Sequence, residues 1–225
     1  MSKLWAVIPA YQEAAAVGAV VRAVKPYVSQ VVVVDDGSSD QTSVQARAAG
    51  AQVLRHWVNR GYGAALTTGT NYALAQGAEA VVHFDADGQF EVSDIPRLVA
   101  ALKLGSPSVA LGSRFLGQVE GLPHLRRLTL KLAILFTWAV SGIKLSDAHN
   151  GFRAFTKEAL ERMRWRQDRM AYGSEVVDEI VRTRTPWVEV PVTVRYTAAT
   201  LKGSKQGRLP ALKIVRDLFL GKLVK

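Results

Sequence analysis

The sequence predicts an α/β protein with a doubly wound, mostly parallel sheet. Short apolar runs alternate with segments of helical periodicity through the first half of the chain, as in successive β-α-β crossovers. Polar clusters follow these runs, where ligands bind in such sheets. The chain has 225 residues, 48% hydrophobic and 21% charged, so it can form one large globular domain with a full core.

The predicted strands of this first half are short and apolar. Val31–Val34 is a continuous β-branched run, as in a strand covered on both faces. Pro9 ends the first apolar run. The predicted strands are Leu4–Ile8, Val31–Val34, Gln52–Arg55, Ala80–Phe84 and Val109–Gly112.

Helices are predicted between these strands. Pro26 stops the first, Asp40 caps the second, and Gly50 and Gly77 end the second and third. Their predicted ranges are Ala14–Val24, Asp40–Ala49, Gly63–Gln76 and Ile95–Leu104. Because β-α-β crossovers are right-handed, the carboxyl ends of the strands should lie at one edge of the sheet.

The polar clusters are expected to meet at that edge and form a site. They are Pro9–Glu13 after the first strand, Asp35–Asp40 after the second, Asn59–Gly61 before the third helix, Asp85–Asp87 after the fourth strand, and Ser113-Arg114 after the fifth.

The sequence Asp85-Ala86-Asp87 is the strongest candidate for metal binding. In extended geometry residues two apart share a face, so the two carboxylates point the same way. Hard oxygen ligands suit Mg²⁺ or Mn²⁺, particularly when a diphosphate supplies further oxygens. The simpler alternative is a polar turn that closes a strand, since Asp and Gly88 favour turns.

The second half of the chain is less regular. The segment Leu125–Ile143 is apolar and helical, but its uncharged part is too short to span a bilayer. Gly151–Phe155 predicts a strand, Gly173–Arg182 a helix, and Trp187–Tyr196 a strand or hairpin. The tail Arg208–Lys225 has its apolar residues near one face.

The net charge of the chain indicates the charge of its binding partner. The formal net charge is +10, and most of the excess follows Arg114, so we expect a polyanionic partner. No recognisable nucleic-acid-binding module is present, and nucleic acid is not expected. The chain has no cysteine, and no apolar signal region precedes the first strand, so a cytoplasmic protein is expected.

Taken in order, the clusters resemble family-2 glycosyltransferases of the GT-A fold. The resemblance is carried by Pro9–Glu13, Val34–Asp40, Asn59–Gly63, Asp85–Gln89 and Gly112–Phe115. The dolichol-phosphate mannosyltransferase and polyprenyl-phosphate glycosyltransferase branch is the most similar. The resemblance implies a GT-A domain over 1–207, with a nucleotide-sugar-binding half (1–115) and an acceptor-binding half (116–207). Residues 208–225 would form a C-terminal amphipathic, membrane-associating helix.

The resemblance also implies roles for individual residues. Expected donor contacts are Pro9, Tyr11, Glu13, Asp36, Asp85, Ala86, Gln89, Arg195 and Lys205; expected metal ligands are Asp85, Asp87 and Gln89; expected acceptor contacts are Arg126, Arg127 and Ser204; expected catalytic residues are Asp87, Arg114, Asp147 and Glu175.

Simpler interpretations stand beside several of these roles. Asp36 could form a helix-capping turn with Ser38 and Asp40, and Arg126 and Arg127 could lie on a solvated helix face. The loop with Arg195, Ser204 and Lys205, similar to one that closes over the donor diphosphate, could be a plain basic loop. Asp147 and Glu175 are expected to contact the sugar, without being assigned as bases. Leu130 stands where the branch often has a serine, so the local acceptor contacts differ.

The predicted activity is metal-dependent, inverting transfer of a hexose from a UDP- or GDP-sugar to a polyprenyl or dolichyl phosphate. The protein is expected to lie peripherally on the inner membrane face, because its second half is cationic and carries two amphipathic segments. The two segments could instead pack in the core or in a homodimer, or against a membrane partner protein. The alternative activities are transfer to a soluble or polysaccharide sugar acceptor, a nucleotidyltransferase, and a degenerate nucleotide-binding protein.

Overall fold

The computed structural model describes residues 3–148 and 150–196. The predicted domain boundary at 207 and the tail 208–225 lie outside the described residues.

The described chain alternates strands and helices, as predicted. In order, the elements are β1 (Leu4–Ala10), α1 (Val17–Val24), η1 (Lys25–Tyr27), β2 (Gln30–Asp35), α2 (Thr42–Ala48), β3 (Gln52–Arg55), α3 (Tyr62–Ala75), β4 (Ala80–His83), η2 (Val92–Asp94), α4 (Ile95–Ala100), β5 (Val109–Glu120), α5 (His124–Ser141), β6 (Arg153–Thr156), α6 (Lys157–Arg162), α7 (Tyr172–Thr183) and β7 (Trp187–Arg195).

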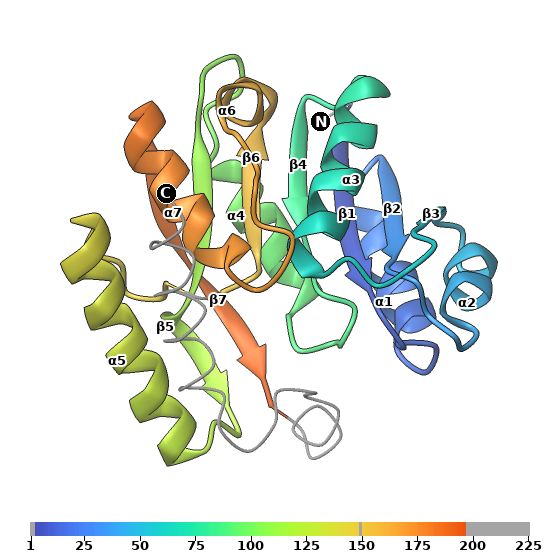
Figure 1. Ribbon diagram of the computed structural model, residues 1–225, viewed down its shortest axis with the longest axis horizontal. Coiled ribbons are helices and arrows are strands. Elements are labelled where there is room, and N and C mark those ends of the chain that lie inside the picture. The colour runs from blue at the N-terminus through green and yellow to red at the C-terminus, as the bar shows by residue number, and fades with distance from the viewer. Residues whose placement is uncertain (1–2, 149, 197–225) are drawn as a thin grey trace.

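One seven-stranded sheet runs through the molecule in the order β3-β2-β1-β4-β6-β5-β7 (Figure 1). The pairs β1–β2, β1–β4, β2–β3 and β5–β7 are parallel, while β6 is antiparallel to both of its neighbours, β4 and β5. The prediction of a mostly parallel, doubly wound sheet is therefore confirmed. The predicted division between residues 115 and 116 falls inside β5.

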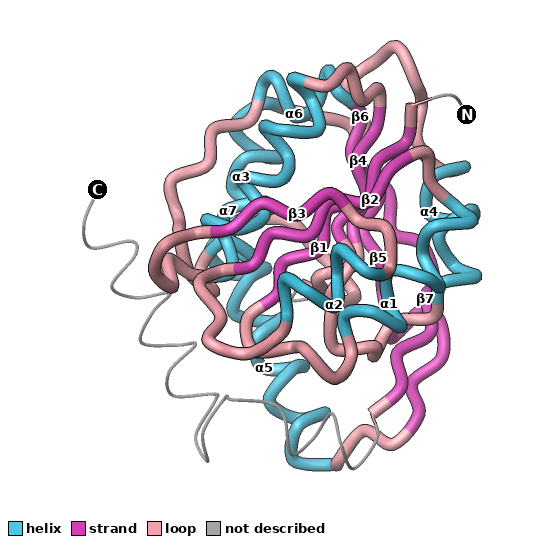
Figure 2. Tube along the Cα trace, turned by 90° about the vertical axis from the view of Figure 1, so that its right-hand side faces the viewer, coloured by secondary structure: helices cyan, strands magenta, loops and turns pink. Residues whose placement is uncertain are grey.

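Helices cover both faces of the sheet, as the continuous apolar strands predict (Figure 2). On one face, Val31 and Val33 of β2 belong to a core with residues of α1, α2 and α4. On the other face, Val32 and Val34 belong to a core with residues of α3, α6 and α7. This alternation follows from the period of two along a strand.

The fifth strand differs from the prediction. The run Val109–Gly112 continues as β5 to Glu120, so Ser113 and Arg114 lie inside a strand and do not follow its end. Beyond Ser113 the register with β7 is interrupted and resumes at Gln118, so the two strands extend together past the rest of the sheet (Figure 1). The long pairing with β7, which is distant in sequence, sets the length of this strand.

The predicted strand or hairpin at Trp187–Tyr196 is confirmed as a single strand, β7, which is parallel to β5. The short helix α6 was not predicted; its N-cap is Thr156, whose side chain accepts a hydrogen bond from the backbone N–H of Ala159. The predicted helices Leu125–Ile143 and Gly173–Arg182 are confirmed as α5 and α7. Gly142, with a positive φ of 74°, follows the last residue of α5.

Candidate active site

The loops after β1 and β2 are fastened to each other. The backbone N–H of Gln12 donates to Ser38 Oγ at 2.9 Å, and that of Glu13 donates to Thr42 Oγ1 at 2.9 Å. Gln12 has a φ of +61°, a conformation that side chains other than glycine rarely adopt. These bonds hold Tyr11, which is 37% exposed, at the carboxyl edge of the sheet.

Pro9 and Asp36, two expected donor contacts, are buried. Pro9 pairs with β2 inside β1. The carboxylate of Asp36 accepts backbone hydrogen bonds from Arg60 at 2.9 Å and Gly61 at 2.7 Å, and its Oδ1 lies 2.7 Å from Nδ1 of His56. Asp36 therefore holds the loop that leads into α3, a role that differs from the alternative of a capping turn with Ser38 and Asp40.

Asp35 and Asp40, and not Asp36, accept the hydrogen bonds that shape the turn before α2. Asp35 accepts from the backbone N–H of Ser38 at 2.8 Å. Asp40 accepts from the backbone N–H of Thr42 at 3.0 Å, and so satisfies a donor in the first turn of α2, as predicted.

Asp85 and Asp87 lie directly after β4, at the carboxyl edge of the sheet, with half-buried side chains. Burial and the charge of Asp87 raise the pKa of Asp85 to about 7, although Tyr62, Arg153 and Arg114 oppose the shift. Burial also raises the pKa of Asp87, against a hydrogen bond from the backbone of Gln89. Two carboxylates that resist ionisation together would be stabilised by a cation between them.

Two residues crowd the carboxylate of Asp85. The hydroxyl of Tyr62, the first residue of α3, donates to Oδ1 at 2.9 Å. A Cβ on Gly151 would lie 2.8 Å from Oδ2 of Asp85 and 2.7 Å from the Tyr62 hydroxyl oxygen, so only glycine fits there without a shift. The backbone before β6 therefore passes directly beside the acidic pair.

Within residues 3–148 and 150–196, no group of three or more His, Asp or Glu side chains could hold a metal ion. A divalent ion at Asp85 and Asp87 would need further oxygen ligands from Gln89, water or a bound diphosphate. The Gln89 side chain is half-buried, and its backbone N–H bonds Asp87 Oδ1 at 3.0 Å. The two-carboxylate arrangement fits a site that substrate phosphates complete.

Arg114 and Asp147 form a buried ion pair. Nε of Arg114 donates to Oδ2 of Asp147 at 2.6 Å, and the backbone N–H of Arg114 donates to the same oxygen at 3.0 Å. The expectation that Arg114 follows the end of a strand is therefore corrected: Arg114 lies inside β5, and Asp147 is its anionic partner. Glu189 on β7 fixes the loop that carries Asp147, because it accepts from the backbone N–H groups of Ser146 and Asp147.

The structure separates Arg126 from Arg127. Arg126 is half-buried, with its guanidinium 4.9 Å from the centre of the Tyr196 ring. Its positive charge opposes the rise in the pKa of Asp87 that burial causes. Arg127 is exposed on α5. The alternative of a solvated helix face therefore holds for Arg127, while Arg126 packs on Tyr196 and its charge acts on Asp87.

Glu175 lies on the first turn of α7 and accepts backbone hydrogen bonds from Arg166 at 2.9 Å and Gln167 at 3.0 Å. It fastens the loop before α7, and this loop touches α3, because the backbone N–H of Ala64 donates to the carbonyl of Asp168 at 3.0 Å. The carboxylate of Glu175 thus orders a loop that lies beside the start of α3, where Tyr62 is located.

Arg195 ends β7, and its backbone N–H donates to the carbonyl of Gln89 at 2.9 Å. Its exposed guanidinium is paired with Glu91 and Glu120. The other two members of the expected basic loop, Ser204 and Lys205, lie outside the described residues.

Sequence reasoning assigned no role to Tyr62, Arg153 or Tyr196. Arg153 on β6 is buried; its Nε donates to the carbonyl of Asn150 at 2.8 Å, and its charge acts on Asp85. Tyr62 belongs to Asn59–Gly63, one of the segments that carry the family resemblance, and Arg153 belongs to the predicted strand Gly151–Phe155. No local signal identified Tyr196, because its partners come from β5 and α5.

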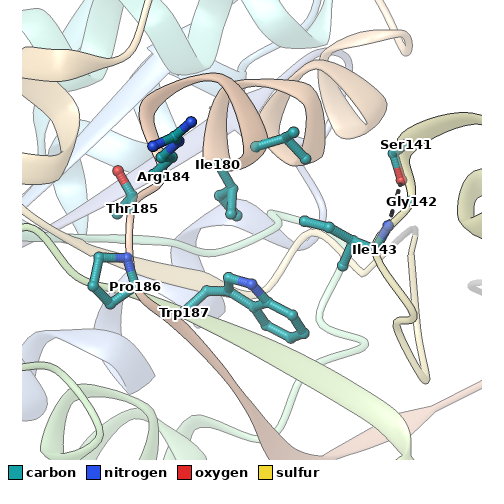
Figure 3. Close-up of a pocket in the computed structure, with 9 residues that line it drawn as sticks. Ser141, Gly142, Ile143, Ile180, Arg184, Thr185, Pro186 and Trp187 are labelled. Atoms are coloured by element: carbon teal, nitrogen blue, oxygen red, sulfur yellow. Dashed lines mark hydrogen bonds between the residues drawn. The ribbon is translucent and has the colours of Figure 1, made fainter.

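A shallow pocket of about 560 Å³ lies at the opposite edge of the sheet. Figure 3 shows it between the end of α5, the end of α7 and Trp187, the first residue of β7. Strand β7 runs parallel to β5, which shares the direction of β4, so its first residue is far from the end of β4, where Asp85 lies. The pocket is therefore separate from the acidic pair.

Comparison with known proteins identifies the family. The family model described as glycosyl transferase family 2 matches residues 5–164. The chain belongs to glycosyl transferase family 2. The match includes β2–β6, all of β1 except its first residue, and the cluster of Tyr62, Asp85, Asp87, Arg114 and Asp147.

Similar proteins show to which branch of family 2 this enzyme belongs. It is 27% identical over 86% of its length to UDP-N-acetylglucosamine–dolichyl-phosphate N-acetylglucosaminyltransferase of Methanococcus voltae, covering 86% of that protein. It is 31% identical over 70% of its length to polyprenol monophosphomannose synthase of Mycolicibacterium smegmatis, covering 63% of that protein. The chain is a glycosyltransferase of the branch that contains dolichol-phosphate mannosyltransferases and polyprenyl-phosphate glycosyltransferases.

Solved structures support the fold. Glucosyl-3-phosphoglycerate synthase of Mycobacterium tuberculosis, in complex with Mn²⁺, uridine diphosphate and glucosyl-3-phosphoglycerate, superposes with a TM-score of 0.66 at 20% identity. The superposition covers 90% of this chain and 75% of that one. The mixed α/β sheet is thus the GT-A fold expected from the sequence.

Proposed function

We propose that this glycosyltransferase transfers a hexose, with inversion, from a UDP- or GDP-sugar to a polyprenyl or dolichyl phosphate, and that the reaction requires Mg²⁺ or Mn²⁺. The observation that carries the proposal is the half-buried pair Asp85 and Asp87 with positive charges around it. Arg114 and Arg153 act on Asp85, and Arg126 acts on Asp87. Such a site suits two anionic groups, a metal diphosphate and a second phosphate.

Asp85 and Asp87, with Gln89, are the proposed ligands of the divalent ion, and Ala86 is the buried residue between the two carboxylates. The ion, when bound, neutralises the charge that develops on the leaving nucleoside diphosphate. Tyr62 and Gly151 set the position of the Asp85 carboxylate from two sides. Mn²⁺ or Mg²⁺ in structural neighbours supports this assignment by similarity of fold alone.

The nucleoside is proposed to lie over the loops after β1 and β2. Tyr11 is exposed there, and Glu13 follows in the same loop. Asp36 supports this pocket from below, because it fixes the backbone of Arg60 and Gly61. Arg195 would reach the donor diphosphate only by exchanging its pairing with Glu91 and Glu120.

The acceptor phosphate is proposed to bind at Arg126, with Arg127 and Ser204 as further contacts; Ser204 lies outside the described residues. A phosphate monoester is already ionised near pH 7, so transfer requires positioning of the acceptor more than a general base. The internal hydrogen bonds of Asp147 and Glu175 support the same view: both carboxylates organise the site. Arg114 is proposed to have two effects on the site. It fixes Asp147 through their ion pair, and its own positive charge favours the ionised form of Asp85.

A membrane-facing surface is proposed on α5. Leucines at helical spacing are more than half exposed along it, and the sequence places Arg127 and Lys131 beside them, also exposed. They are Leu125, Leu128, Leu132 and Leu135. None of the helices within the described residues is long and apolar enough to cross a bilayer. A helix that lies in the headgroup region would bring Arg126, near its first turn, to the level of lipid phosphates.

The activity is tested with purified protein, Mn²⁺, a panel of radiolabelled UDP- and GDP-sugars, and undecaprenyl phosphate or a soluble sugar as acceptor. We expect label in the lipid phase with one of the donors, lost when the metal is chelated. Label only in the soluble sugar would replace the proposal with transfer to a sugar acceptor. Asp87→Asn should abolish Mn²⁺-dependent nucleotide binding; unchanged binding would show that the metal site is elsewhere.

The membrane surface is tested by sedimentation with vesicles of anionic or neutral lipid. We expect binding to anionic vesicles and about a tenfold weaker association for Leu128→Ser with Leu132→Ser, because each substitution removes buried apolar area. The matched control is Val44→Ser with Leu104→Ser, which changes two residues of similar exposure on α2 and in the loop after α4. Equal losses in both double variants would contradict a specific role for α5.

A further inference from the structure

Tyr196 lies between two of the arginines near the acidic pair. Its hydroxyl accepts a hydrogen bond from a terminal nitrogen of Arg114, and its ring lies beneath the guanidinium of Arg126 at 4.9 Å. Arg114 is itself held in place by its buried ion pair with Asp147. Tyr196 therefore connects a fixed internal ion pair to a half-buried arginine that acts on Asp87.

Tyr196 is itself held firmly. Its side chain is only 6% exposed and belongs to the core beneath β5 and β7. Its backbone N–H donates to the carbonyl of Glu120 at 2.9 Å, and Gly121 approaches so closely that a Cβ there would lie 2.3 Å from the Tyr196 carbonyl oxygen. The ring is thus a rigid support, whereas an arginine side chain has many rotamers when nothing restricts it.

We propose that Tyr196 is a positioning residue for Arg126: its ring holds the guanidinium beside Asp87, where Arg126 binds the phosphate monoester of the acceptor. The aromatic face attracts the cation and leaves the N–H groups at the edge of the guanidinium available to oxygen ligands. The hydroxyl keeps the ring in place through Arg114. This inference rests on the proposed acceptor site and adds a residue outside the matched family region, which ends at residue 164.

The test is a double-substitution cycle on binding of farnesyl monophosphate, measured by calorimetry with the full chain and Mn²⁺-UDP present. Tyr196→Leu should weaken binding about 5- to 20-fold, the range of a partly desolvated cation–π contact. Arg126→Leu should weaken it at least as much. The double variant should bind no more weakly than Arg126→Leu alone, because the ring acts only through that arginine.

Tyr196→Phe supplies the conservative variant. It keeps the ring and removes the hydroxyl, so binding should stay within about threefold of wild type. Affinity for Mn²⁺-UDP alone should be unchanged in Tyr196→Leu, which a general structural defect would not allow. Tyr27→Leu, at an exposed tyrosine of η1, controls for loss of an aromatic side chain.

Three results would overturn the inference: multiplicative losses in the cycle, equal losses of Mn²⁺-UDP and farnesyl monophosphate, or no binding of farnesyl monophosphate by the wild type. If Tyr196→Leu does not fold, Tyr196→Phe with Tyr196→Trp decides, since both retain an aromatic face and both should bind. The proposed function is judged separately, by transfer of labelled sugar, so binding without transfer would contradict the activity and leave the role of Tyr196 supported.

Discussion

The hydroxyl of Tyr62 donates a 2.9 Å hydrogen bond to Oδ1 of Asp85. The two residues are 23 positions apart, at the start of α3 and just past the end of β4. Tyr62 is itself fixed by an edge-to-face contact with Tyr172, with ring centres 6.4 Å apart. The acidic pair therefore has one member with a fixed orientation before any ligand arrives.

Tyr62→Phe should weaken binding of Mn²⁺-UDP about 3- to 10-fold, because a hydrogen bond to a carboxylate orients that carboxylate. Titration of the fluorescence of a labelled nucleotide measures the effect. Tyr72→Phe is the matched control, since Tyr72 lies farther along the same helix. Equal affinities for Tyr62→Phe and wild type would show that Asp85 needs no support from α3.

Gly151→Ala should reduce Mn²⁺-UDP affinity more strongly, by about tenfold or more. The added Cβ would approach both Asp85 Oδ2 and the Tyr62 hydroxyl at less than 3 Å, so one of these groups must move. The matched control is Gly173→Ala, because a Cβ there meets only Arg153 at 3.7 Å, an ordinary contact. If both variants bind the nucleotide like wild type, the backbone beside Asp85 is not part of the site.

Asp147→Leu should lower the free energy of unfolding by about 3–5 kcal/mol, because it leaves the buried guanidinium of Arg114 without its carboxylate. Urea denaturation measures the change. Glu161→Ala, which breaks the exposed pair with Lys157, should cost less than about 0.5 kcal/mol. Combining Asp147→Leu with Arg114→Met should restore part of the loss; simple addition of the two losses would contradict a coupled pair.

His83 should make the protein sensitive to acid. Burial and Arg153 lower its pKa from 6.5 to about 3, and its Nε2 lies 2.9 Å from Thr70 Oγ1. Between these two pH values the unfolded chain binds a proton that the folded protein does not. His83 therefore does not reduce the free energy of unfolding above pH 6.5. Below that pH, its effect lowers the free energy of unfolding by up to about 1.4 kcal/mol per pH unit.

His83→Gln keeps a polar partner for Thr70 and removes the titration. Urea denaturation of both proteins at pH 7.5, 6 and 4.5 should therefore give curves of free energy against pH that converge or cross as the pH falls. Parallel curves would mean that His83 is protonated equally in both states.

Much of the site followed from local sequence. The apolar runs predicted β1–β4, and the polar residues after them predicted which edge of the sheet carries the acidic pair, because side-chain periodicity and turn residues are local properties. The same information placed α5 to within a few residues of its bounds. It could not distinguish Arg126 from Arg127, since both precede the same apolar segment.

The sequence by itself determined the family, the doubly wound sheet and the position of Asp85 and Asp87 after a strand, because the short motifs and the side-chain periodicity are local properties of the chain. Only the tertiary structure decided the partners of these residues. Asp147 meets Arg114 across 33 positions, and Tyr196 meets Arg114 across 82, after β6 enters the sheet antiparallel between β4 and β5. Such pairs depend on how distant strands align. Burial then decides their chemistry, because a charge removed from water must find its partner within the fold.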